Sequence, residues 1–147
     1  PLAGVVVVAV WYHQIPMIIQ MNTVLYKARE ALTDKNGEFV INAEDIEGSA
    51  PSMTLRPTFK IFLPGYGSFP RFGQTTPRAS DEEVFEGAGS EVELPRVKAG
   101  TERLLNYREL NPYEISKDPF TEVPNFMRLI NEEARNLGLE PYRPREK

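Results

Sequence analysis

The sequence predicts a mainly β protein, in which two packed antiparallel sheets form a β-sandwich before Pro95 and only short helices follow. The main observation is a change of hydrophobic period near Pro95, from about two residues to about 3.6. The 13 prolines among 147 residues are close to twice the average share of roughly 5%, which favours a loop-rich β protein over a helical bundle. We therefore expect a sandwich over residues 1–95 and a helical C-terminal extension with an extended tail over residues 96–147.

The first strand is expected at Val5 to Trp11. This run is apolar without alternation, which is the pattern of a strand buried on both faces. Residues Tyr12 to Asn22 are interrupted by Pro16, so we expect a long connection or the ragged end of a hairpin there. The alternating segment Thr23 to Thr33 predicts a half-buried strand, although a helix also fits it.

A tight turn is expected at Asp34 to Gly37, because the Asn-Gly pair supplies the positive φ angles that a hairpin turn needs. The chain then returns along Glu38 to Asn42. A further strand is predicted within Thr54 to Leu63, where alternating apolar side chains would face the core. These side chains are Phe59, Ile61 and Leu63.

The segments before Pro95 complete the predicted sandwich. Ser68 to Ser80 is rich in proline, glycine and threonine, which indicates a long ordered loop or an interaction surface. The segments Glu83 to Glu86 and Ser90 to Pro95 flank a Gly-Ala-Gly sequence and predict a final hairpin.

Two helices are predicted after Pro95. We expect Thr101 to cap a short helix that ends before Pro112. A second helix is expected from Pro124 to Leu137, because proline suits its first turn and Gly138 suits the position after its end. Its apolar stripe should pack on the second apolar face of Val5 to Trp11. The stripe consists of Phe126, Leu129, Ile130 and Ala134.

Composition excludes several classes of function. The 17 basic and 21 acidic residues give a net charge of −4, so we do not expect a nucleic-acid partner. The chain has no cysteine and one histidine, which excludes disulfides, thiolate metal sites and clustered imidazole ligands. We expect no cofactor. The longest apolar run, Val5 to Trp11, is far shorter than the roughly 20 residues of a membrane-spanning helix, and we expect no span.

Candidate catalytic and metal sites are weak. His13 lacks a matched nucleophile or substrate group in the sequence. The acidic residues from Asp81 to Glu86 lack the spacing of an EF-hand calcium loop. We therefore expect neither a catalytic nor a metal role for them.

A group of aromatic side chains has two interpretations, either a platform that binds a glycan or peptide, or an ordinary core with a folded-back loop. They are Trp11, Tyr12, Tyr66, Phe69 and Phe72.

Three strings resemble the transthyretin-like, carboxypeptidase regulatory-like family of the bacterial envelope. They are PLAGVVVVAVW at residues 1–11, ALTDKNGEFVI at 31–41, and FKIFLPGY at 59–66. The residues Thr33 to Phe39 match the family pattern T-D-x-x-G-x-F, and Pro64 to Tyr66 match its P-G-Y strand end. The resemblance covers Pro1 to about Pro95. It implies a seven- or eight-stranded sandwich outside the cytoplasm, at the cell surface, extracellular or in the periplasm.

The same resemblance implies a protein without catalysis. The hydrolase branch of the family uses several histidines and a serine-rich C-terminal tetrapeptide, whereas this chain has one histidine and ends in PREK. The family also has a strand before the PLAG turn, and here the chain starts at that turn. We expect a mature or trimmed chain, with an open strand position beside Val5 to Trp11.

An open strand position predicts a structural subunit of an extracellular, pilus-like filament, in which copies of the chain associate by strand complementation. The expected interface residues are Val6, Val8, Val10, Phe69 and Phe72. The alternative is a glycan- or peptide-binding domain, or an accessory domain, of an envelope lipoprotein. This alternative is favoured if the missing strand was lost by trimming. Its ligand surface would consist of Trp11, Tyr12 and Tyr66.

Overall fold

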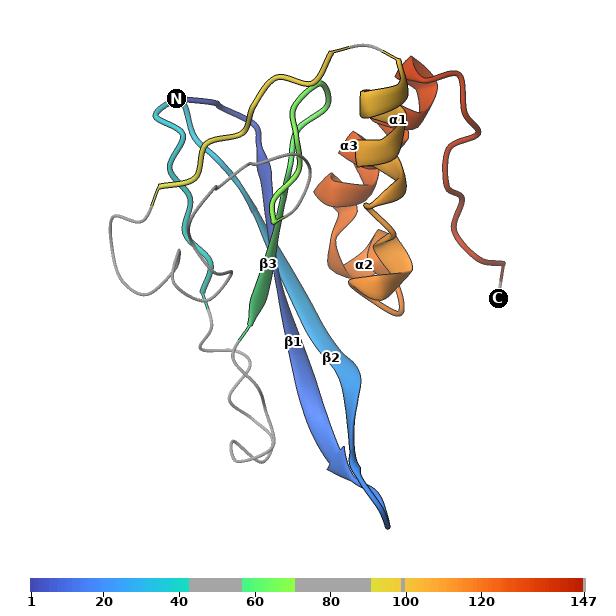
Figure 1. Cartoon of the computed structure of the whole chain (residues 1–147). Coiled ribbons are helices and arrows are strands. Elements are labelled where there is room, and N and C mark those ends of the chain that lie inside the picture. Colours follow the sequence, from blue (N-terminus) through green and yellow to red (C-terminus); the bar gives the residue numbers. More distant parts are fainter. Residues whose placement is uncertain (43–56, 71–90, 99, 147) are drawn as a thin grey trace.

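The computed structural model describes residues 1–42, 57–70, 91–98 and 100–146 and shows an antiparallel sheet with helices packed on one face (Figure 1). In chain order the elements are β1 (Val6–Pro16), β2 (Met21–Leu32), β3 (Thr58–Phe62), α1 (Thr101–Arg108), the 3-10 helix η4 (Pro112–Glu114), α2 (Pro119–Glu122) and α3 (Pro124–Asn136). All described strands precede Pro95 and all described helices follow it, so the predicted switch of element type is confirmed.

The described sheet has three strands in the order β2-β1-β3. The central strand β1 pairs with β2 along its whole length, from Val6 to Pro16. It pairs with β3 only from Val6 to Val10. In the described part of the chain, the sheet therefore has two strands beyond Val10, and the β1–β2 hairpin projects away from the helices (Figure 1).

The part of β1 from Val6 to Trp11 is buried on both faces, as the unbroken apolar sequence of Val5 to Trp11 predicts. Side chains at even positions, such as Val6 and Val8, pack in one cluster with the helices. Side chains at odd positions, such as Val5 and Val7, pack in a second cluster on the opposite face. A strand that is central in its sheet and covered on both faces has no position at which a polar side chain would reach water.

The helical layer is anchored on β1 by α3. The stripe that the sequence predicts for this helix packs against Val6, Val8 and Val10 in one buried cluster, so both the helix and its docking surface are confirmed. The ring of Phe126 also meets the ring of Phe62 on β3 edge to face, with centroids 6.4 Å apart. The helix that starts near Thr101 is confirmed as α1, but Thr101 is its first helical residue and Gly100 occupies the cap.

The opposite face of the sheet is covered by segments without regular strands. The side chains that cover Val5, Val7, Ile61 and Phe69 there come from the N-terminus, from the region after β2 and from residues 91–94, and they are Leu2, Phe39, Ile41, Val92 and Leu94. Phe59 of β3 and Leu63 directly after β3 belong to the same cluster. The second layer is thus apolar enough to close the core but forms no second sheet in the described part of the chain.

The predicted β-sandwich is therefore wrong, and the described chain is a mixed α/β structure with a single three-stranded antiparallel sheet and C-terminal helices. The turn at Asp34 to Gly37 does form, with Gly37 at φ 75° and Asp34 Oδ1 accepting from the amide of Asn36 at 2.8 Å. The returning segment Glu38 to Asn42 nevertheless joins no ladder. Of the predicted final hairpin, residues 91–95 form no strand and the rest lies outside the described residues.

Two further expectations are settled by β1 and β2. The predicted strand Thr23 to Thr33 is confirmed by β2. Of the two alternatives for Tyr12 to Asn22, the long connection is wrong and the hairpin end is confirmed, because β1 continues through Pro16 and pairs with Met21, with a bulge between Trp11 and Tyr12. Within the described residues, no helix has both the length and the apolar character needed to cross a membrane.

Candidate interaction site

The acidic side chains closest to the sheet stabilise the fold. Glu30 on β2 reaches the start of α3, where its two carboxylate oxygens accept from the amides of Asn125 and Phe126, each at 2.8 Å. The N-cap residue of α3, Val123, offers no side-chain acceptor. The carboxylate therefore supplies the helix cap and interacts favourably with the positive end of the helix dipole.

Glu122 at the end of α2 covers the edge of β2. Its Oε2 accepts from the amide of Ala28 at 3.1 Å, and its Oε1 accepts from the hydroxyl of Ser116 at 2.5 Å. Because the amide of Ala28 faces away from β1, this contact occupies the edge at that point. A shallow hollow nearby is lined by Lys27, Ser116, Lys117 and Glu122, among others. Glu122 is the acidic residue of this hollow, and both of its carboxylate oxygens already accept hydrogen bonds within the fold.

Two buried polar side chains tie α1 to the rest of the molecule. Glu133 on α3 is fully buried, and its carboxylate accepts from Nε and Nη2 of Arg103. That hydrogen bonding raises the pKa of Arg103 above its ordinary value. Asn106 accepts from the amide and the hydroxyl of Ser68 at 2.8 and 2.9 Å and donates to the carbonyl of Tyr66 at 3.0 Å.

The residues expected at an assembly interface lie inside the molecule where the structure describes them. Val6, Val8 and Val10 are buried beneath the helices. Phe69 is 1% exposed, and its backbone exchanges two hydrogen bonds with Ile61. Phe72 lies outside the described residues. Both edges of β1 from Val6 to Val10 are paired within the chain, so the expected open strand position beside this segment is wrong.

The three aromatic residues expected at a ligand surface are not brought together. Trp11 is buried with Ala9 in a cluster on the face away from the helices. Tyr12 packs against the helical cluster on the other face. Tyr66 lies after β3, where the guanidinium of Arg96 is 5.6 Å from its ring centre. One ligand cannot contact all three at once.

His13 stacks on Tyr26 across the hairpin, with ring centres 3.7 Å apart and the planes inclined by 22°. Its Nε2 is buried and has no hydrogen-bond partner in the described part of the chain. No group of three or more His, Cys, Asp or Glu residues that would hold a metal ion occurs among the described residues. The predicted absence of a catalytic role for His13, Glu83 and Glu86 stays a prediction.

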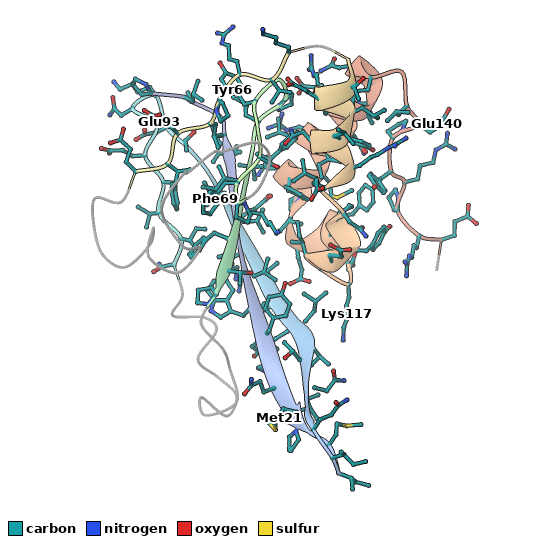
Figure 2. All side chains as sticks on the ribbon, viewed as in Figure 1. Met21, Tyr66, Phe69, Glu93, Lys117 and Glu140 are labelled. Atoms are coloured by element: carbon teal, nitrogen blue, oxygen red, sulfur yellow. The ribbon has the colours of Figure 1, made fainter. Side chains whose placement is uncertain are left out.

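The exposed surface feature that stands out is the tip of the β1–β2 hairpin. Ile18 and Ile19 have relative exposures of 105% and 95%, and the loop is closed by a 2.7 Å hydrogen bond from the amide of Met17 to the carbonyl of Gln20. Figure 2 shows the labelled Met21 at the far end of the hairpin from Tyr66. The exposed large apolar side chains of this hairpin tip are Ile15, Met17, Ile18, Ile19 and Met21.

The hairpin tip is also uncharged. No acidic or basic side chain occurs from Gln14 to Thr23, and every residue from Ile15 to Thr23 is exposed. A cluster of exposed apolar side chains is typical of a site of interaction. The sequence analysis missed this site because Pro16 was interpreted as the end of regular structure. The signal was present as the uncharged string IPMII between two long β-prone segments.

Comparisons of the chain with protein-family models, with curated proteins and with solved structures each found no match. The resemblance of residues 1–95 to the transthyretin-like, carboxypeptidase regulatory-like family therefore stays a prediction. The candidate site depends on the geometry of the hairpin alone.

Proposed function

We propose that this chain is a non-enzymatic structural subunit that associates with copies of itself in an extracellular, filament-like assembly. The observation that carries the proposal is the uncharged, apolar tip of the β1–β2 hairpin. The extracellular location rests on the family resemblance. The contact is placed at the hairpin tip, because the edges of β1 beneath the helices are already paired with β2 and β3.

Charge favours the hairpin tip as the contact between copies. The chain carries a net charge of −4, so two copies repel each other when they approach through acidic surface. The ten residues from Gln14 to Thr23 carry no charge. An approach through the hairpin tips brings no like charges together and removes Ile18 and Ile19 from water.

The size of the apolar contribution indicates a reversible contact. Burying an isoleucine side chain fully contributes about 1.5–3 kcal/mol, so four isoleucines from two tips would contribute about 6–12 kcal/mol before other terms. Association costs about 4–15 kcal/mol in lost freedom of motion. Tip-to-tip contact alone therefore gives concentration-dependent association, and a filament needs a second contact, because a single two-fold contact closes as a dimer.

Three acidic side chains of the described residues have structural roles. Glu30, Glu122 and Glu133 accept hydrogen bonds that hold the helices to the sheet or to each other. The alternative of a glycan- or peptide-binding domain has no specific support, because Trp11 and Tyr12 lie on opposite faces of β1.

The test compares the native chain with Ile18→Ser/Ile19→Ser by sedimentation velocity and light scattering, from micromolar to millimolar concentration. Both side chains are exposed, so the double variant should fold as the native chain does, which circular dichroism checks. Leu105→Ser on α1 is the matched control, because Leu105 is another exposed large apolar residue, at 48%. We expect association of the native chain and the control, and its loss in the double variant. A native chain that stays monomeric at millimolar concentration would refute the proposal.

A further inference from the structure

The C-terminal tail, residues 139–146, turns back after α3 and runs beside the helices (Figure 1). Its anchor is the backbone of Tyr142. The amide of Tyr142 donates to Oδ1 of Asn131 at 2.8 Å, and Nδ2 of Asn131 donates to the carbonyl of Tyr142 at 3.0 Å. A single side chain on α3 thus binds both polar groups of one backbone residue, in the way that a peptide-binding site holds the main chain of its ligand.

The side chain of Tyr142 adds an aromatic contact to this anchor. It packs against the buried helical cluster that contains Tyr107, and its ring meets the ring of Tyr113 edge to face, with centres 6.3 Å apart. The guanidinium of Arg145 lies 4.5 Å from the centre of the same Tyr113 ring, which is a favourable cation–π geometry. Asn131, Tyr107 and Tyr113 therefore form a tail-binding site, which recognises a tyrosine and an arginine three residues after it.

The rest of the tail is held less firmly. Residues 143–146 are exposed, and the ion pair between Arg143 and Glu140 lies within the tail, with side chains 82% and 88% exposed. Exposed ion pairs contribute little to stability. The tail follows Gly138, which has φ 70°, and a glycine can change its backbone conformation at low cost. The tail can therefore swing out about Gly138 while α3 keeps its contacts with the sheet.

We propose that, in the assembly, the tail of one copy occupies the tail-binding site of a second copy and so supplies the second contact that a filament needs. This inference rests on the proposed function, because the hairpin tip supplies the first contact. A second copy carries the segment whose fit to this site the structure demonstrates. Exchange replaces each contact of the tail by an identical one, which makes it a low-cost route to association.

Charge also favours a second copy as the occupant. Residues 140–147 contain three basic and two acidic side chains, whereas the whole chain has a net charge of −4. The tail is thus net basic and the remainder of the chain is net acidic. The tail of one copy is therefore attracted to the body of another.

The tail and the hairpin tip lie on separate parts of the molecule. Figure 2 shows the labelled Glu140 of the tail beside the helices and the labelled Met21 at the far end of the hairpin. A reciprocal exchange of tails is a two-fold contact, as is the meeting of two hairpin tips. A copy that makes both contacts is joined to two different neighbours, so the assembly extends beyond a dimer.

The short link between α3 and the tail determines when exchange occurs. A segment on a short flexible linker competes at an effective concentration in the millimolar range, so separate copies keep their own tails at lower concentration. Chains that meet through their hairpin tips raise the local concentration, and exchange then follows. The variant Ile18→Ser/Ile19→Ser should therefore stay monomeric, although its tail is intact.

Complementary variants of the full chain test the tail-binding site on the Ile18→Ser/Ile19→Ser background, which removes the tip contact. Tyr142→Ala leaves the site intact and without its anchor residue, and Asn131→Leu releases an intact tail. Unlabelled Asn131→Leu chain should shift the side-chain amide signals of Asn131 in isotope-labelled Tyr142→Ala chain, with half-saturation at about millimolar concentration. The matched control is an added chain with Asn131→Leu/Tyr142→Ala, which should bind about tenfold more weakly. Circular dichroism checks the fold of each variant.

Sedimentation velocity on chains with the native hairpin tip measures the exchange in the assembly. At concentrations at which the native chain associates, we expect species larger than a dimer, whereas Tyr142→Ala should stop at the dimer. Asn131→Leu should stop there too. Arg143→Ala is the matched control and should assemble as the native chain does, because the side chain of Arg143 is exposed and lies outside the tail-binding site.

The outcomes separate this inference from the proposed function. If the native chain stops at the dimer, or if Tyr142→Ala assembles as far as the native chain, the copies meet through their tips without exchange of tails, and this inference alone is refuted. If the native chain never associates, both fail. If the labelled chain binds the added chain without Tyr142, or a proline-rich peptide without tyrosine, as tightly as the intact tail, the site does not recognise this tail, and the exchange is likewise refuted.

Discussion

Removing Arg103 should destabilise the chain strongly, because Glu133 would keep a buried charge without its main partner. Glu133 is fully buried, and the donor that would remain to it among the described residues is Nδ2 of Asn136, 3.4 Å from its Oε2. Loss of one partner from a buried ion pair costs about 3–5 kcal/mol. For Arg103→Met we expect the free energy of unfolding to fall by that amount, and the melting temperature by roughly 10–15 °C for a chain of this length.

The double variant Arg103→Met/Glu133→Leu is the control for this prediction. Replacing a buried ion pair by apolar residues of similar size is often neutral or stabilising, so the second change should recover most of the loss. Urea unfolding can be followed by the fluorescence of Trp11, which is buried against Tyr26 and Phe59. A loss below about 1 kcal/mol for Arg103→Met, well short of the 3–5 expected, would refute the view that this pair holds α1 to α3.

Two further predictions concern the other groups that hold the helices in place. Glu30→Ala removes both acceptors at the start of α3 and should lower the free energy of unfolding by about 1–3 kcal/mol, with a smaller loss for Glu30→Gln; equal stability of all three chains in urea would contradict the capping role. Burial, with a smaller contribution from Tyr142, raises the pKa of Tyr107 from 10.0 to about 12, so its neutral form is favoured in the folded chain. This stabilisation is complete below pH 10 and is lost as the pH rises towards about 12; the decline should be smaller in Tyr107→Phe, and identical profiles would show that Tyr107 does not cause it.

The local pattern of the sequence was sufficient to predict the elements that depend on residues close together along the chain. The helix at Pro124 follows from its apolar stripe and from Gly138, which adopts φ 70° after its end. The burial of Val5 to Trp11 on both faces follows from its lack of polar residues. The turn at Asp34 follows from Asn36 and Gly37, because a tight turn depends on only a few adjacent residues.

The second layer of the core was predicted wrongly because it depends on contacts between distant segments. Phe39 and Ile41 alternate as a strand would, and they do cover the sheet. An alternating pattern shows which side chains face the core, but it does not show that the backbone finds a neighbouring strand to pair with. The cap of α3 was missed for a related reason, since its acceptor Glu30 is 95 residues away from Asn125.

The candidate site was missed because Pro16 led us to expect a long connection or the ragged end of a hairpin at Tyr12 to Asn22. Only the length of β1 and β2 shows that Ile18 and Ile19 extend beyond the elements that cover the sheet in the described part of the chain. β3 ends opposite Val10, and the cover of β2 ends at Ala28. A strand pair rises about 3.3 Å per residue, so the six residues of β1 after Val10 carry the hairpin tip roughly 20 Å past the three-stranded part of the sheet.

Folding alone gives no reason for this extension. Ordering each residue costs about 1–2 kcal/mol in backbone entropy, whereas each hydrogen bond of a two-stranded ladder contributes only about 1 kcal/mol net. The distal side chains are exposed, so they add no apolar burial to offset the difference. An isolated two-stranded hairpin is marginal for this reason. The same segment becomes favourable once the isoleucines of the hairpin tip are covered, and under the proposed function the uncharged stretch from Gln14 to Thr23 of a second copy provides that cover.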